Sequence, residues 1–590
     1  MIITKRVLTV LCCLMMLLPI VPAAADDGFS TSYTYTYDYW EDVQESPDAY
    51  RVENIIDSVT LGLDKLDNIR MKNPQSLFVR DNTIYVCDTD NNRILVIERQ
   101  GSAYILTDVI NEMTGAEGEA APEDIPEETG EEEGTDEPGD QTEAAPEETA
   151  SDETTAEEEA SPADEPNDGA AAPEGGTEGD GSGKTETAWD PNKFSQPYDI
   201  SVDTEGYIYV ADYGNQRIVK MKKNEATGQY EFIHAYIKPT DATFDQSLAF
   251  LPKKVVVDVA GRVYALCKNV NKGLVKYDSD GEFTGFIGAN TVSVSMAEYI
   301  WKRYFMTKEQ RAQSENFVPT EYENIYIDDE GFIYATNTVF SEYDLKSDSA
   351  KPIRRLNSVG SDILIKNDRF PPIGDLDWVA DAANDNSKQD KGPSRFVDVT
   401  VMNNDIYVAL DRSRGRIFGY DSQGILLWAF GTKGNTDGAF TAAISIEHMG
   451  YDILVLDRLK NTITVFTPTE YGRTIYLATE KYLNGEYDES ANLWREVLKM
   501  NANYPLAFRG IGRAVLRQDK YEEAMNYFKL AHDRENYGRA FKLYRKEWID
   551  KNFWWIILIV AALLIIPLIV GRIKRMKWEV SEYERSKIRK

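Results

Sequence analysis

A short unit of strands joined by tight turns recurs along most of this chain, and it limits the folds open to the sequence. In the clearest copy, the apolar run Ile200–Val202 leads through the turn Asp203–Gly206 into Tyr207–Asp212, and Asn215–Val219 follows after a polar loop. Short apolar or alternating runs between turn-forming residues are the pattern of antiparallel hairpins. This part of the chain is therefore predicted to be mainly β.

Five other stretches repeat the unit less regularly, and they begin near Pro74, Val255, Ile325, Val397 and Ile444. Four-stranded units at periods of roughly 40–50 residues are typical of propeller blades. Six copies predict a six-bladed β-propeller over residues 51–469. Its exposed edges would be removed if Arg51–Gly62 added a strand to the last blade, so we expect this segment to close the ring. Candidate fourth strands are Phe283–Ile287 and Leu426–Phe430.

The unit resembles the NHL repeat. Its pattern here is Pro-x-x-Ile-x-Val-Asp, a glycine, Ile-Tyr-Val-Ala-Asp and then Asn-x-Arg-Ile; residues 194–223 match it well and residues 73–98 nearly so. The resemblance implies an NHL-type propeller.

Two insertions interrupt the predicted ring. Residues 115–187 consist mainly of Glu, Ala, Pro, Gly and Thr, so they cannot form a core and are predicted to be disordered. We favour a solvated tether over a calcium-binding or partner-binding arm. Residues 291–317 place apolar side chains at helical spacing, and this helix is expected to pack as a lid on one blade or, alternatively, to face a ligand.

The net charge of −35 arises mostly in the first insertion, where 27 acidic residues in 117–186 accompany the single Lys184. Basic residues are concentrated only at the end of the chain, so nucleic acid is not expected as a partner. Cys87 and Cys267 fall in different predicted blades, which makes a disulfide between them improbable on geometric grounds.

Both ends of the chain have membrane-related signals. Residues 1–25 have the charged start, apolar run and small-residue end of a secretory signal peptide, and 26–50 form an N-terminal extension. Residues 552–571 are predicted to be a transmembrane helix, because Phe553–Val570 carries no charge. The basic tail, 572–590, predicts a cytoplasmic end and hence a single-pass type I protein of the cell membrane with extracellular N-terminal domains.

Residues 471–550 change to a helical period. The Gly-Glu-Tyr-Asp-Glu pattern around Tyr487 returns around Tyr521 after 34 residues, the length of a TPR repeat. TPR-like hairpins are therefore predicted, either as a groove for a protein partner in or near the membrane or as a stiff spacer. The candidate partner-binding residues are Tyr487, Trp494, Tyr521 and Phe528.

Catalytic patterns are missing from the sequence. His234, His448 and His532 are too few for a metal-binding cluster, and no nucleophile motif or phosphate loop occurs. We therefore expect no catalytic residue, no metal and no cofactor, and a protein that is not an enzyme.

Polar and aromatic residues that recur in the blades have structural interpretations. We place Asp203, Asp258, Asp328 and Asp398 at equivalent positions, as turn residues rather than calcium ligands. Packing of the blades accounts for Arg93, Arg217 and Arg416 and for Tyr85, Tyr209, Tyr264, Tyr334 and Tyr407. The tyrosine-rich run Ser32–Trp40 is expected to add an edge strand, with a sugar-stacking platform as the alternative.

The whole arrangement, with Val318–Tyr322 as part of the likeness, resembles a largely uncharacterised family of exported membrane proteins of Gram-positive bacteria. The resemblance implies a role beside sugar-importing ABC systems. Our leading hypothesis is an extracellular, membrane-anchored binding or scaffold protein. The alternatives are a calcium-dependent propeller enzyme of the lactonase or lyase type and a carbohydrate-binding module.

Overall fold

The computed structural model describes residues 34–37, 43–66, 69–116, 190–288, 322–338, 340, 351–366, 372–375 and 393–589. The predicted signal peptide, the predicted helix of residues 291–317 and nearly all of the acidic insertion lie outside these residues.

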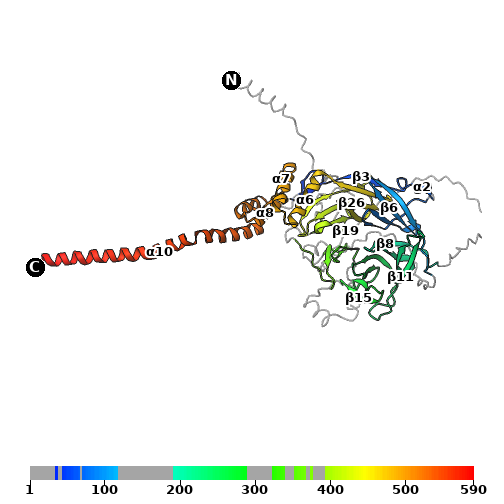
Figure 1. The fold of residues 1–590 in the computed structure, drawn as a ribbon, viewed down its shortest axis with the longest axis horizontal. Coiled ribbons are helices and arrows are strands. Elements are labelled where there is room, and N and C mark those ends of the chain that lie inside the picture. Colours follow the sequence, from blue (N-terminus) through cyan, green and yellow to red (C-terminus); the bar gives the residue numbers. More distant parts are fainter. Residues whose placement is uncertain are drawn as a thin grey trace, which may run out of the picture. The chain divides into compact units, whose positions relative to one another are not determined.

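Six antiparallel sheets follow one another along the chain as the blades of a propeller (Figure 1). We number them in chain order. Blade 1 contains β4 (Ser76–Arg80), β5 (Thr83–Asp88), β6 (Arg93–Gln100) and β7 (Ala103–Ile110). Blade 2 contains β8 (Pro197–Val202), β9 (Tyr207–Asp212), β10 (Arg217–Lys223) and β11 (Tyr230–Tyr236). Blade 3 contains β12 (Pro252–Val257), β13 (Val263–Cys267), β14 (Leu274–Tyr277) and β15 (Phe283–Ile287).

The later blades vary more in composition. Among the described residues blade 4 has three strands, β16 (Asn324–Ile327), β17 (Ile333–Thr336) and β18 (Ile353–Leu356). Blade 5 contains β19 (Phe396–Met402), β20 (Ile406–Asp411), β21 (Arg416–Tyr420) and β22 (Leu426–Phe430). Blade 6 contains β25 (Ala443–Met449), β26 (Asp452–Asp457) and β27 (Thr462–Pro468). The short parallel pair β23 (Thr432–Lys433) and β24 (Ala439–Phe440) lies between blades 5 and 6 in the sequence. The predicted six-bladed ring is confirmed, as are the fourth strands β15 and β22.

A strand from the N-terminal region completes blade 6. β3 (Tyr50–Ile56) pairs antiparallel with β27, with Ile56 opposite Ile463 and Tyr50 opposite Pro468. This pairing confirms that the segment beginning near Arg51 closes the ring. The backbone groups at the outer edge of β27 are thereby satisfied within the chain.

The tyrosine-rich run also forms a strand. β1 (Tyr35–Tyr37) joins the outer edge of blade 5 opposite Ala429 and pairs with β2 (Val43–Glu45). The Tyr35 hydroxyl is buried and donates to Asp375 at 2.8 Å, and Arg416 forms an ion pair with the same carboxylate. The edge-strand expectation for this run is confirmed.

Apolar clusters between neighbouring blades form the core of the ring. One cluster joins Tyr209 of blade 2 to Val255 and Tyr277 of blade 3, and another joins Tyr264 of blade 3 to Ile325 of blade 4. The tyrosines therefore pack between blades, as predicted. Cys87 and Cys267 are buried free thiols in β5 and β13.

In blades 1 and 2, whose sequences match the NHL pattern best, a buried ion pair links the second strand to the third. Asp212, at the end of β9, accepts hydrogen bonds from the Ser195 amide at 2.8 Å and from Arg217 Nε at 2.9 Å. Asp88 and Arg93 form the same pair in blade 1, at 2.7 Å. In blade 5, Arg416 instead pairs with Asp375, so the structural interpretation of these arginines holds with a different partner there.

Helices follow directly after blade 6. They are α6 (Glu470–Leu483), α7 (Tyr487–Met500), α8 (Pro505–Arg517), α9 (Tyr521–Leu530) and α10 (Arg534–Ile588); earlier in the chain, a single turn forms α2 (Leu63–Leu66). Short 3₁₀ turns are η1 (Thr89–Asn91), η2 (Tyr213–Asn215) and η5 (Asn403–Asp405). We call α6 to α9 the helical layer.

Glycines let the helices of this layer approach closely. A Cβ atom on Gly510 of α8 would lie 2.5 Å from the Trp494 indole, and one on Gly512 would lie 2.7 Å from the Phe528 ring. Trp494 is 4% exposed and Phe528 is 0% exposed. The predicted partner-binding role would require Trp494 to be exposed, but its ring is buried because it fills the space above a glycine backbone. Phe528 is likewise part of the core and not of a surface.

The helical layer shares one apolar cluster with blades 5 and 6. The Tyr504 hydroxyl donates to the backbone oxygen of Leu427 in β22, and Arg513 of α8 lies 3.7 Å from the Asp421 carboxylate. These contacts tie the layer to the propeller through buried groups rather than through a linker alone.

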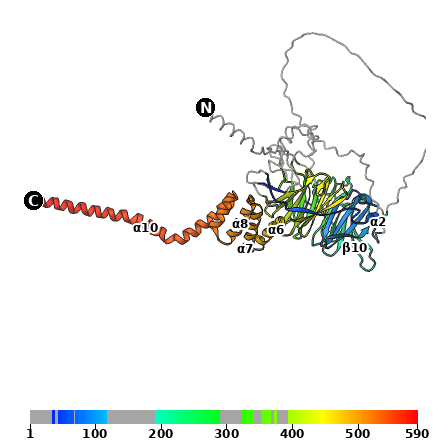
Figure 2. The ribbon, with the colours of Figure 1, turned by 90° about the horizontal axis from the view of Figure 1, so that it is seen from above.

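The last helix, α10, contains 55 residues (Figure 2). Its apolar stretch has a mean hydropathy of 3.0 and none of it is buried by the described chain. By length and composition α10 is able to cross a membrane, in agreement with the predicted span.

Candidate ligand cavity on the propeller axis

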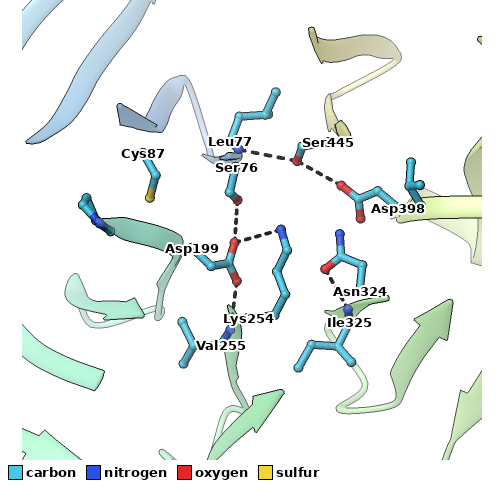
Figure 3. Close-up of polar contacts among 12 residues, drawn as sticks. Ser76, Leu77, Cys87, Asp199, Lys254, Val255, Asn324, Ile325, Asp398 and Ser445 are labelled. Carbon is cyan, nitrogen blue, oxygen red and sulfur yellow. Dashed lines mark hydrogen bonds and ion pairs between the residues drawn. The ribbon is translucent and has the colours of Figure 1, made fainter. Parts of the chain in front are cut away.

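The innermost strand of every blade directs one polar side chain toward the axis. We call these six residues the axial ring: Ser76, Asp199, Lys254, Asn324, Asp398 and Ser445. In β8, β12, β19 and β25 the pairing register shifts immediately before the ring residue. A β-bulge of this kind re-aims a side chain, and here it accompanies the turn of a polar group inward. Figure 3 shows the ring residues converging from different strands.

Hydrogen bonds link the ring from blade to blade. Asp199 accepts from Ser76 Oγ at 2.5 Å and from the Val255 amide at 2.8 Å, and thus connects blades 1, 2 and 3 (Figure 3). Asp398 accepts from Ser445 Oγ at 2.9 Å and from the Ile446 amide at 2.8 Å, which connects blades 5 and 6. Some polar side chains of the axial ring therefore connect neighbouring blades by hydrogen bonds.

The ring lines a cavity of about 360 Å³ that continues along the inner strands. The next layer of the wall consists of Phe78, Ser201, Val256, Tyr326 and Glu447. Beyond it lie the turns after the first strands, with Asp203, Asp258 and Asp328. Ligand cavities in proteins span roughly 300–1,000 Å³, so this space suits a small molecule.

Three ring residues, Lys254, Asp199 and Asp398, are ionisable and lie in a desolvated setting. Lys254 Nζ lies 3.3 Å from Asp199 Oδ1. Burial opposes its charge, but Asp199 and Asp398 outweigh burial and raise the pKa of Lys254. Burial raises the pKa of Asp398 to about 6, against the pull of Lys254 and three hydrogen bonds.

Glu447 is the most strongly perturbed carboxyl group of the wall. Burial, and next the charge of Asp398, raise its pKa well above the usual range. The Thr400 hydroxyl lies 3.1 Å from Glu447 Oε2 and 2.8 Å from His448 Nδ1. Burial lowers the pKa of His448 to about 4, so this imidazole is neutral at physiological pH.

Three of the recurring aspartates are turn residues, as predicted. Asp203 Oδ1 accepts from the amides of Glu205 and Tyr207, both at 2.9 Å, and Asp258 and Asp328 accept from their own turns in the same way. Asp398 was wrongly grouped with them. It lies within β19 at the position of Asp199, because the bulges shift the alignment of the first strands.

Within the described residues, three carboxylates close enough to share a metal ion are Asp328, Glu330 and Asp405. Arg355 Nη2 lies 3.0 Å, 3.2 Å and 3.4 Å from their oxygens, respectively. A guanidinium group thus already neutralises this cluster.

The predicted partner-binding residues lie in the helical layer and not at the cavity. Tyr487 is half-buried and its ring packs 5.6 Å from that of Tyr482, whereas Tyr521 donates to Asp519 at 2.7 Å on the surface. Sequence reasoning missed the axial ring. Its signal was the polar residue inside each first strand that precedes an apolar residue, as Asn324 precedes Ile325.

The fold and the cavity define a six-bladed β-propeller protein with a small axial site and a C-terminal helix able to span a membrane. Residues 194–221 match the NHL repeat family. No curated protein matches the chain.

Solved structures with similar folds include virginiamycin B lyase from Staphylococcus aureus, 10% identical over 71% of this chain and 99% of that one, with a TM-score of 0.33. A protein of unknown function from Bacteroides thetaiotaomicron is 9% identical over 74% of this chain and 76% of that one, with a TM-score of 0.35. A putative 6-phosphogluconolactonase from Bacteroides uniformis is 10% identical over 60% of this chain and 68% of that one, with a TM-score of 0.27.

Proposed function

We propose that this chain is an extracellular binding protein anchored in the cell membrane by α10. Its propeller binds a small polar ligand in the axial cavity, and its helical layer contacts a protein in or near the membrane. The sequence resembles exported membrane proteins that accompany sugar-importing systems, so we propose a component of such an import system as the protein that the helical layer contacts.

The observation that supports ligand binding is a pair of buried polar groups without partners. Asn324 and Ser201 are each 3% exposed and line the cavity. Asn324 Oδ1 accepts from the Ile325 amide at 2.7 Å, while its Nδ2 and the Ser201 hydroxyl have no hydrogen-bond partner in the part of the chain that the structure describes. Both residues line the cavity, so a ligand there would be able to accept hydrogen bonds from these donors.

The position of Lys254 favours a binding protein over a calcium-dependent propeller enzyme. Its ammonium group extends among Asp199, Asn324 and Asp398, where a channel-bound calcium ion would need oxygen ligands (Figure 3). The ring therefore supplies its own cation. A carbohydrate-binding module remains the second candidate, because amide, hydroxyl and carboxyl groups together also suit a sugar.

The ligand test uses the full-length chain in detergent and a library of small polar compounds. Compounds that raise the melting temperature of the wild type are tested on Asn324→Leu, which keeps the side-chain size but cannot donate. Asn526→Leu, at an exposed position of α9, is the control. We expect binding to be lost in Asn324→Leu alone; a library without any binder would contradict the proposal.

The partner test uses crosslinking in cells followed by mass spectrometry. Because the helical layer shares its core with blades 5 and 6, deleting it would expose apolar surface, so surface substitutions are preferable. Tyr487→Ala combined with Tyr521→Ala is expected to lose a specific membrane partner that the wild type captures. Capture that is unchanged in this variant would show that the partner uses another surface.

A further inference from the structure

The wall of the axial cavity carries far more acidic than basic groups. Eight carboxyl groups line it, against Arg80, Lys220 and Lys254, and two of the eight, Asp258 and Asp328, are paired with Arg262 and Arg355. Lys254 is paired with Asp199, and Lys220 lies over the Tyr207 and Tyr209 rings, 4.4 Å and 5.2 Å from their centres. A concave site of one sign focuses its field and concentrates ligands of the opposite sign.

The carboxyl groups of the cavity differ in the hydrogen bonds and ion pairs that they form with the rest of the protein. Asp398 accepts three hydrogen bonds, from Ser445 Oγ and from the amides of Val399 and Ile446. Glu447 is 5% exposed and accepts from Thr400, but no Lys or Arg of the described residues forms an ion pair with it. Burial without a cation raises the pKa of this carboxyl group, and a cation beside it would favour the ionised form.

The unpartnered donors lie in the same cavity wall as this carboxyl group. Figure 3 shows the Asn324 amide nitrogen directed toward the space beside Lys254 and Asp398. Ser201 and Glu447 belong to the next layer of the wall, with Phe78 and Tyr326 as its aromatic members. Among the described residues, the cavity wall thus contains a carboxyl group without an ion-pair partner, Glu447, and two hydrogen-bond donors without an acceptor, Asn324 and Ser201.

We propose that the axial cavity binds a small hydroxylated primary amine in its protonated form. Its ammonium group is held by Glu447, and its oxygen atoms accept hydrogen bonds from Asn324 and Ser201. This assignment rests on the proposed binding function and specifies the class of ligand.

A protonated amine fits the charges of the cavity better than an anion or a neutral polyol does. An anion would enter a cavity in which acidic groups still outnumber basic ones after Asp258 and Asp328 are paired with arginines, and it would meet Lys254 already paired with Asp199. A neutral polyol would satisfy Asn324 and Ser201 but would leave Glu447 without a cation. The raised pKa of Glu447 fits this account, since an ammonium group beside it would favour the ionised form. Aromatic walls add cation–π attraction.

The test compares two matched series by calorimetry on the full-length protein in detergent. Glucosamine, glucose and glucuronate share one ring, and ethanolamine, ethylene glycol and glycolate share a two-carbon skeleton, so that only the charged group differs. We expect the amine to bind at least tenfold more tightly than its neutral and anionic counterparts in one series or both.

The key variant is Glu447→Gln, which keeps the size and the hydrogen-bonding capacity toward Thr400 but removes the charge. It should weaken amine binding at least tenfold and leave any weak binding of the neutral compound unchanged. Glu225→Gln, on an exposed turn of blade 2, is the matched control and should bind as the wild type does. If Glu447→Gln does not fold, Ser201→Ala serves instead, because Ser201 has no protein partner in the described chain to lose.

The outcomes separate this inference from the broader function. A neutral or anionic compound that binds as tightly as the amine, or amine binding that is unchanged in the variants, would overturn the amine assignment while the binding function stands. The same holds if neither amine binds but another compound of the polar library does. Failure of every compound, library included, would overturn both.

Discussion

The Tyr50 hydroxyl, in the strand that closes the propeller, donates a hydrogen bond of 2.8 Å to the hydroxyl of Tyr476, in the first helix after it. The two rings meet edge to face, with centres 6.4 Å apart, and Tyr476 also contacts the sulfur of Met402 in β19. Ring closure and helix docking therefore depend on the same buried pair.

Removing one hydroxyl of this pair should destabilise the propeller and the helical layer together. We expect Tyr50→Phe or Tyr476→Phe to lower the free energy of unfolding by about 1 kcal/mol, the usual value for a buried hydrogen bond. The double variant should lose less than the sum, because the residues are in contact. Urea unfolding of all four proteins measures this coupling, with Tyr583→Phe on exposed α10 as the control. Additive effects would refute it.

Substituting the packing glycines of α8 should damage the helical layer despite the higher helix propensity of alanine. A new Cβ would press on the Trp494 ring in Gly510→Ala and on the Phe528 ring in Gly512→Ala. Overpacking of this kind typically costs about 1–3 kcal/mol. Gly538→Ala in α10, where a Cβ meets nothing within 4 Å, should stabilise the helix. Circular dichroism melting of the three variants checks the opposite signs.

Removing the charge of Arg217, which forms a buried ion pair with Asp212, should strongly destabilise the protein. Arg217→Met would leave Asp212 buried without its cation, which typically costs roughly 3–5 kcal/mol. Lys529→Met, at an exposed position of α9, should have little effect. Chemical denaturation compares the two, and similar stabilities would mean that the pair is dispensable.

Acid sensitivity should depend partly on His448. Its pKa of about 4 in the folded protein lies below the ordinary value of 6.5, so the unfolded chain takes up a proton between these values and the folded chain does not. Stability from this group is present above pH 6.5 and is lost as the pH falls toward 4. His448→Asn keeps a partner for Thr400 but cannot be protonated. It should lose on the order of 2 kcal/mol less than the wild type between neutral pH and pH 4.5. Equal pH dependence of urea unfolding would contradict this.

The architecture was predictable because hairpin periodicity is local. The alternation from Tyr207 to Asp212 and the turn at Gly206 specify a hairpin without any knowledge of the rest of the chain. Even the closing strand followed from the need to satisfy the edge of β27.

The axial site was not predictable in the same way. Asp398 looks like a turn aspartate in the sequence, and only the register shift after Phe396 places it beside Ser445. Trp494 likewise looks like a surface aromatic at helical spacing, and its burial depends on Gly510 in the next helix. Bulges and interhelical contacts depend on the partner strand or helix, which the pattern within one segment does not include.

The pairing of β3 with β27 has a consequence for how the protein is made. β3 is synthesised early, but its partner follows about 400 residues later, so ring closure is among the most non-local contacts in the chain. A ribosome must deliver every blade before Ile56 meets Ile463. Until then β3 has no partner strand, and the nascent propeller presents an open seam to chaperones and proteases. The helices α6 to α10 follow β27 directly in the chain, so a chain that stops before ring closure also lacks α10, the helix that is able to cross a membrane.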